Sequence, residues 1–291
     1  MRQHYYLISS LYELFLEAKA PVTLSGFLDQ CEDMLLPEEF AQLKKLFLLR
    51  DLSVAVQEFA FPAEGRKPLL WPREQLADLL APFDISLAAL RPGELEFREL
   101  GGRSSRLDEI LLTFYNRLDE IVSPQIADWY LFDLDLRNVS TALALRKTKQ
   151  PFHESIIKMG NAAQQILQST AVDFGLSLDL TYLPKLIEVY GEKQLHSMER
   201  DKQAINEAPP AQPLAIEKHL DTIRWDWLTD NWEVDTFSTS AVYSYALKLG
   251  MVERWNGLSQ EVGERLFDKL VNQIKGSIVF SDELFVGRGK R

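Results

Sequence analysis

The stretch WYLFDLDLRNVSTALALRK, residues 129–147, decides the fold. Read at helical spacing, it carries one apolar stripe of Trp129, Phe132, Leu136, Val139 and Leu143. A second stripe beside the first is formed by Leu131, Leu134, Ala142 and Leu145. A helix that is apolar over so much of its circumference must be covered by neighbours on several sides. The stretch therefore predicts a central core helix, and helical spacing along the rest of the chain predicts an all-α, multi-helix bundle.

Polar residues interrupt these stripes, and we interpret them as structural. Asn138 lies inside the second stripe, so its amide needs a buried partner. Asp133 and Asp135 are two residues apart on the helix and therefore point in different directions. Arg137 follows Asp133 by four residues, the spacing of an ion pair at the edge of a packed surface. We expect Arg137 and Asn138 to hold the helix in register and not to contact a substrate.

Composition narrows the class of protein. The chain has 291 residues, of which 46% are hydrophobic, enough for one large domain or two to three small ones. Its net charge of −11 argues against a nucleic-acid surface, which needs an excess of Lys and Arg. The single cysteine, Cys31, excludes an internal disulfide and is expected to be a buried, inert thiol. No signal peptide and no long apolar run are evident, so a cytoplasmic protein is expected.

Further helices are predicted on both sides of the central one. We expect them at about 23–35, 36–59, 72–80, 105–121, 153–171 and 182–206, with three more after residue 214. Residues 5–16 begin either a buried helix or an extended segment. Pro and Gly punctuate residues 60–103, which predicts an irregular excursion over the surface, and 208–213 is a linker. The chain thus divides into segments 1–103, 104–207 and 214–291, which form either separate lobes or one continuous compact unit.

One internal echo joins the first two segments. LRDLSVAV at 49–56 matches LRNVSTAL at 136–143, and both lie in long predicted helices that follow another helix. Eight residues of apolar helix can match by chance, so the echo is compatible with a duplication and with coincidence.

The chain carries few patterns typical of catalysis. It has no glycine-rich phosphate loop, no serine-hydrolase elbow and no pair of histidines spaced for zinc on a helix. Glu188, Glu192 and His196 stand four residues apart and could hold a metal ion, but a solvated helix face explains them equally. We therefore predict a protein that is not an enzyme and has no cofactor, and keep a carboxylate- and histidine-based metal enzyme as the alternative.

Tryptophans gather in the last segment. Trp225, Trp227 and Trp232 crowd one short helix. This density suits either a junction between helical layers or an exposed docking patch. The junction is favoured because Tyr243 and Tyr245 are close in sequence and offer partners for burial.

Several stretches resemble a known family. YYLISSL at 5–11, the helix from Phe132 onward, EKHLDTIRWDWLTD at 217–230 and ALKLGMVERW at 246–255 are together similar to a bacterial family encoded among the genes of V/A-type ATPases. The central helix also resembles the D-x-x-N-x-x-x-x-L-R-x-K element of the C-type subunit of these ATPases, which has a d-type counterpart in eukaryotes. Here the element reads Asp135, Asn138, Leu143 and Lys147, with Arg146 in a looser register.

This resemblance implies a function. It implies an all-helical, non-enzymatic piece, cytoplasmic or peripheral at the inner face of the membrane, that couples the central rotor stalk of the ATPase to its membrane ring. Its partners would be the stalk proteins and the rotor ring. The C-type subunit is built from pseudo-repeated helical lobes, a design that the echo between 49–56 and 136–143 would suit. A factor that binds the ATPase only transiently during assembly or regulation is a further alternative.

Overall fold

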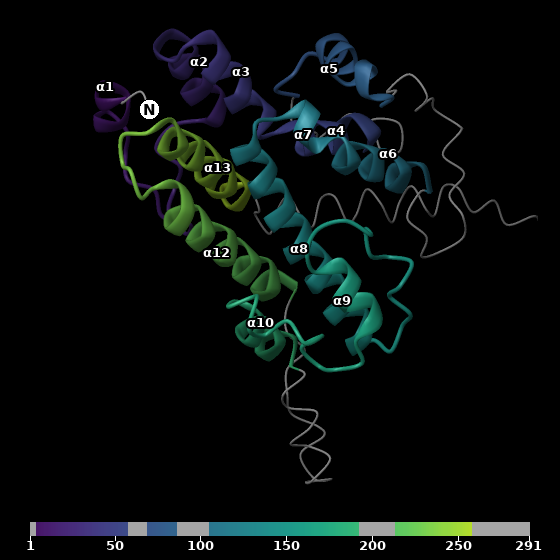
Figure 1. Cartoon of the computed structure of the whole chain (residues 1–291). Helices are drawn as coiled ribbons and strands as arrows, with labels where there is room; N and C mark the ends of the chain where they lie inside the picture. Colours follow the sequence, from purple (N-terminus) through teal and green to yellow (C-terminus); the bar gives the residue numbers. More distant parts are fainter. Residues whose placement is uncertain (1–3, 58–68, 86–104, 192–212, 258–291) are drawn as a thin grey trace, which may run out of the picture.

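The computed structural model describes residues 4–57, 69–85, 105–191 and 213–257 (Figure 1). Within these ranges the only regular secondary structure is helical, which confirms the all-α prediction. Before the central helix lie α1 (Tyr5–Ser9), α2 (Leu24–Met34), α3 (Pro37–Lys45), α4 (Leu48–Gln57), α5 (Arg73–Leu80), the short 3-10 helix η1 (Ala81–Phe83), α6 (Ser105–Asn116) and α7 (Leu118–Ile121). The central helix and those after it are α8 (Pro124–Lys147), α9 (Ala163–Gln168), α10 (Leu183–Tyr190), α12 (Pro213–Trp232) and α13 (Thr239–Asn256).

Helix α8 is the core helix that the sequence predicts. It begins with Pro124 in its first turn, where the missing N–H of proline costs nothing, and ends with Arg146 and Lys147 near the negative end of its dipole. In Figure 1 it runs diagonally through the middle of the molecule, from α4 and α7 towards α9. Residues of both apolar stripes are buried, including Trp129, Leu134 and Leu136. The helix is therefore covered on several sides, as expected.

Two hydrophobic clusters share α8 between them. The first packs residues of α2 to α7, the first half of α8, the end of α12 and α13. The second begins at Leu136 and packs the second half of α8 against α9, α10 and the first half of α12. Helices α8 and α12 each contribute to both clusters. The boundary between the two hydrophobic clusters therefore does not coincide with the boundaries between the sequence segments 1–103, 104–207 and 214–291.

The structure differs from the expected helix boundaries in several places. The predicted helix at 36–59 is divided into α3 and α4, and only Tyr5–Ser9 is helical in the stretch 5–16. Most of 153–171 is irregular, with helix only at Ala163–Gln168. Helix α10 ends at Gly191, whose φ of 79° is typical of a left-handed cap. Besides residues 1–3, four stretches lie outside the described residues: 58–68 and 86–104 of the excursion, 192–212, and the chain after 257. The stretch 192–212 includes the rest of the helix predicted at 182–206 and all of the linker except Pro213, which begins α12.

The irregular stretches before and after α9 are held by side chains of α8. Arg146 donates hydrogen bonds to the carbonyl groups of Ala171 and Val172, at 2.9 and 3.0 Å, and its guanidinium lies 4.1 Å from the ring centre of Phe174. Asn138 bonds the backbone of Ile157 on both sides: its Nδ2 donates to the carbonyl oxygen at 2.9 Å and its Oδ1 accepts from the N–H at 3.1 Å. These contacts replace the backbone bonds that a helix at 153–171 would have made.

The echo in the sequence marks a structural repeat. The same separation along the chain relates Pro37 to Pro124, each at the first position of a helix, and Asp51 to Asn138. Just as Asn138 binds Ile157, Asp51 accepts a hydrogen bond from the N–H of Leu70, again 19 residues further on. Buried positions also correspond, in the pairs Leu43 and Tyr130, Leu49 and Leu136, Leu52 and Val139, and Ala55 and Ala142. We call α3, α4 and α5 the first copy, and α8 and α9 the second copy.

Replacing Asn138 by leucine tests the two hydrogen bonds that its side chain makes with the backbone of Ile157. Asn138→Leu keeps the volume nearly constant but leaves the N–H and carbonyl of Ile157 without their partners. We expect the free energy of unfolding to fall by about 2 kcal/mol in urea titrations. Asn161→Leu makes the same change on an exposed side chain and is the matched control, with an expected effect within about 0.5 kcal/mol. If both variants lower the free energy of unfolding equally, the two hydrogen bonds between Asn138 and Ile157 do not stabilise the fold as expected.

Candidate functional site

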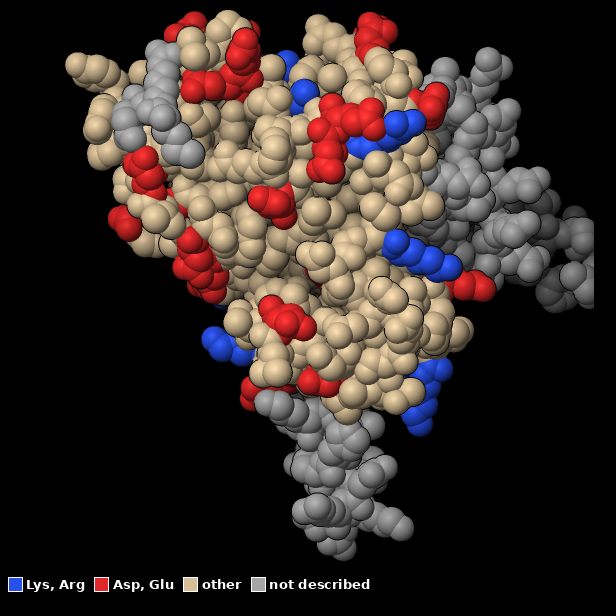
Figure 2. Space-filling model, in the orientation of Figure 1, with Lys and Arg blue, Asp and Glu red and all other residues tan. Residues whose placement is uncertain are grey.

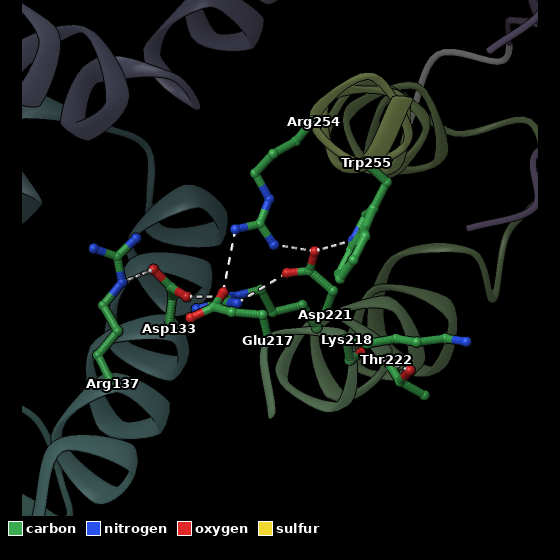
Figure 3. Close-up of polar contacts among 9 residues, drawn as sticks. Asp133, Arg137, Glu217, Lys218, Asp221, Thr222, Arg254 and Trp255 are labelled. Atoms are coloured by element: carbon green, nitrogen blue, oxygen red, sulfur yellow. Dashed lines mark hydrogen bonds and ion pairs between the residues drawn. The ribbon is translucent and has the colours of Figure 1, made fainter. Parts of the chain in front are cut away.

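The most polar interior region of the described structure is a chain of charges between α8, α12 and α13 (Figure 3). At its α8 end, Asp133 receives two guanidinium groups. Its Oδ2 lies 2.6 Å from Nε of Arg137, one turn further along the same helix, and its Oδ1 lies 2.7 Å from Nε of Arg224 on α12. Arg137 reaches solvent, whereas Asp133 is only 5% exposed. The ion pair that the sequence predicts is thus present and is extended inward by Arg224.

The chain of charges continues through Asp221 on α12. Its Oδ1 lies 3.0 Å from Nη1 of Arg224, and its Oδ2 accepts hydrogen bonds from Arg254 and from the indole Nε1 of Trp255, the latter at 2.8 Å. Arg254 also reaches Glu217 on the outer side of α12, at 3.3 Å. Arg254 and Trp255 stand in the last turns of α13, so Asp221 joins the two helices at that end.

The protonation states follow from this geometry. Burial would raise the pKa of Asp133, but the charges and hydrogen bonds of Arg137 and Arg224 outweigh burial and hold the pKa below its usual value. Burial would lower the pKa of Arg224, and the two carboxylates of Asp133 and Asp221 instead raise it. Asp133 and Arg224 are therefore both charged near neutral pH. Both oxygens of each buried carboxylate are already bonded, so the arrangement joins helices and offers no vacant ligand.

Asp135 points to a different neighbour. Its Oδ1 and Oδ2 accept hydrogen bonds from the backbone N–H groups of Ala162 and Asn161, at 3.0 and 3.2 Å, just before α9. Gly160 precedes them with a φ of 86°, and a Cβ there would lie 2.4 Å from Oδ1 of Asp135. Only glycine fits this approach. Burial raises the pKa of Asp135, because two peptide N–H groups compensate less than two guanidinium groups do.

The tryptophans divide between junction and surface. Trp227 stacks on Phe132 with ring centres 4.8 Å apart. The ring centres of Trp129 and Trp232 lie 5.5 and 5.8 Å from the ring centre of Trp227. This cluster fills the angle between α8 and α12. Trp225 instead has Nζ of Lys248 at 4.9 Å above its ring. It borders an open hollow whose other lining residues are Leu14, Phe15, Leu16, Glu17 and Thr222.

Of the residues considered for a metal site, only Glu188 lies in the part of the chain that the structure describes. Glu188 is exposed on α10, and Glu192 and His196 lie outside the described residues. In the part of the chain that the structure describes, no group of three or more His, Cys, Asp or Glu side chains is placed to hold a metal ion. Cys31 is buried, and burial raises the pKa of its thiol to about 12.

Sequence reasoning missed most of the chain of charges. Asp221, Arg224, Arg254 and Trp255 were within stretches recognised as helical, but their roles were not predicted. One signal was available: Asp221 and Arg224 alternate with Leu220 and Ile223, which are buried, so charged and apolar residues share the inner side of α12. A charged pair three residues apart at such a position requires partners from another helix.

Fold and site together define an all-helical protein in which buried ion pairs and hydrogen bonds join α8, α12 and α13. The family model described as "Protein of unknown function (DUF2764)" matches residues 94–278, more than half of the chain, and the chain belongs to this family. No curated protein and no solved structure matches the chain. None of the helices in the described residues has the length and apolar character needed to cross a bilayer.

Removing the central cation of the chain of charges tests its contribution to stability. Arg224→Met leaves Asp133 and Asp221 buried with one cation fewer each. We expect the free energy of unfolding to fall by about 3 kcal/mol. The double variant Asp133→Leu/Arg224→Met should recover about 1 kcal/mol or more, because an apolar pair avoids the cost of a buried unpaired charge.

The matched control uses an ion pair at the surface. Arg117 lies 2.8 Å from Glu120, and both side chains are about half exposed. Arg117→Met should cost no more than about 1 kcal/mol in the same urea titrations. A loss for Arg224→Met as small as that of the control would show that the buried chain of charges does not hold the helices together.

Proposed function

We propose that this chain is a non-enzymatic interaction protein of a bacterial V/A-type ATPase, either a stable component or an accessory factor, placed between the central stalk and the membrane ring. The observation that supports this proposal is the internal helical repeat. The C-type subunit, which the central helix resembles, is built from pseudo-repeated helical lobes. The second copy contains the resembling element, and there Asp135 and Asn138 hold the backbone that follows.

A rigid body suits the proposed role. A coupling protein transmits position or torque through packed surfaces, and it makes or breaks no bond. The chain of charges through Asp133, Arg224 and Asp221 ties α8 to α12 and α13, and Asn138 ties α8 to the loop before α9. Directional buried contacts of this kind favour one arrangement of helices over others.

The N-terminal segment supplies candidate contact residues. Tyr6, Tyr12 and Phe15 are 89%, 62% and 57% exposed. Large aromatic side chains that face water are enriched at protein interfaces, since a partner gains much by covering them. Figure 2 shows acidic side chains spread over the visible face with fewer basic ones between them, in keeping with the net charge of −11. A stalk or ring surface that carries basic residues would complement this face.

Co-purification tests the proposal. The tagged full-length chain is expressed in its native cells, membranes are solubilised, and the chain is purified with high-salt washes and analysed by quantitative mass spectrometry. Stalk and ring proteins recovered in a fixed ratio to the chain would support a stable component, and recovery only with partly assembled ATPase would support an assembly factor. If no ATPase protein is recovered from either fraction, the proposal is wrong.

Surface variants make the same experiment sharper. Tyr6→Ser/Tyr12→Ser/Phe15→Ser should lower the recovery of ATPase proteins about tenfold, equivalent to about 1.4 kcal/mol of binding free energy, without changing the melting temperature. Leu178→Ser changes a side chain that is 95% exposed elsewhere on the surface and should leave recovery unchanged. Equal recovery for the triple variant and the wild type would exclude the N-terminal segment as the contact.

A further inference from the structure

Asp51 is the buried acid in the first copy that is least well paired. Its side chain is 0% exposed. One oxygen, Oδ2, accepts hydrogen bonds from the N–H groups of Leu70 and Trp71, at 2.7 and 2.8 Å. The other oxygen, Oδ1, is equally buried and has no hydrogen-bond partner among the residues that the structure describes. A carboxylate oxygen in this position is costly, because it has lost its hydration and gained no donor.

The second copy shows what a complete contact looks like at this position. Asn138 uses both ends of its amide: the oxygen accepts from the N–H of Ile157 and the nitrogen donates to its carbonyl. Asp51 makes the accepting half of the same contact with Leu70. The donating half is missing, because a carboxylate carries no proton, whereas a carboxylic acid carries one.

We propose that Asp51 is held as a neutral carboxylic acid, whose Oδ1–H donates to the carbonyl of Leu70 as Nδ2 of Asn138 donates to that of Ile157. We call the contact between Asp51 and the backbone of Leu70, and that between Asn138 and the backbone of Ile157, the clasps of the two copies. The clasp of the first copy depends on the proton of Asp51, whereas the clasp of the second copy is made by an amide and does not depend on pH. Loss of the proton as pH rises leaves a buried anion at the clasp and weakens the hold on residues 69–72. The proposal does not depend on the ATPase role.

The groups around Asp51 determine the direction in which its pKa is shifted. Burial raises the pKa of Asp51, and the N–H groups of Trp71 and Leu70 and the charges of Arg50 and Lys44 oppose it without cancelling it. Arg50 belongs to α4, like Asp51, and Lys44 belongs to α3, where its ammonium group lies 4.2 Å from the ring centre of Trp71. Arg50 and Lys44 are the charged groups that most oppose the raised pKa of Asp51.

The sign of the pH dependence follows. A carboxyl group whose pKa is raised by folding stabilises the fold fully below its unfolded pKa of 3.8, and this contribution is lost as pH rises through the folded value. The clasp is therefore tight in acid and looser above that window. Loosening would free Trp71, whose indole Nε1 donates to the carbonyl of Lys44 at 3.1 Å, and with it the start of α5.

Exchanging the two clasp residues tests the proposal. Melting temperatures of the wild type, Asp51→Asn and Asn138→Asp are measured from pH 4 to pH 8. The difference between Asp51→Asn and the wild type isolates residue 51 from all other titrating groups. We expect the melting temperature of Asp51→Asn to rise relative to that of the wild type as pH increases. We expect the melting temperature of Asn138→Asp to fall relative to that of the wild type as pH increases.

A second measurement needs no variant. Carbon-13 NMR of the wild-type carboxyl groups follows the protonation of Asp51 directly, and hydrogen exchange at Leu70 and Trp71 follows the clasp. We expect Asp51 to titrate above the ordinary carboxyl range and local protection at both amides to fall as it ionises. Titration at or below the ordinary range, or a constant difference in melting temperature between Asp51→Asn and wild type, would overturn the proposal.

Discussion

A buried polar side chain that grips the backbone 19 residues further along the chain is the contact on which both copies of the repeat depend. Helices α4 and α8 are apolar over much of their surface, and apolar burial is non-directional, so it does not by itself fix how a helix is rotated or shifted. The hydrogen bonds of Asp51 and Asn138 are directional, so they fix the rotation and the shift of each helix. Each fixes where the chain returns to its helix, and therefore where α5 and α9 begin to pack.

The two copies differ at matching positions, where one has apolar residues and the other has charged residues. Leu46 and Leu48 of the first copy are buried at the positions that Asp133 and Asp135 occupy in the second. The second copy must join partners that the first lacks: the pair of helices α12 and α13 through Arg224, and the loop before α9 through its peptide N–H groups. Burying a charged group costs hydration energy that burying a leucine does not, but a charged contact selects the position of its partner.

The features set by local spacing could be predicted from the sequence, whereas those set by distant contacts could not. Ser123 and Pro124 start α8, and the stripes of Trp129 to Leu143 bury it, because both signals lie within a few turns of the helix. At 153–171 the same kind of spacing failed, since Asn138 and Arg146 bind that segment from another part of the chain. Arg224 and Asp133 are 91 residues apart, a separation that no helical period encodes.

Three aspartates show which effect decides the behaviour of this interior. Asp51, Asp133 and Asp135 are all buried, yet only Asp133 has a lowered pKa. Asp133 faces two guanidinium groups, while Asp51 and Asp135 each face two peptide N–H groups. Two guanidinium groups in direct contact therefore outweigh the loss of hydration at Asp133, whereas two peptide N–H groups do not, even where the charges of Arg50 and Lys44 also act, as at Asp51. The ion pair of Asp133 and Arg224 between α8 and α12 therefore keeps its charges near neutral pH. The raised pKa values of Asp51 and Asp135 make the two contacts in which a carboxyl group holds the backbone more sensitive to protons than this ion pair.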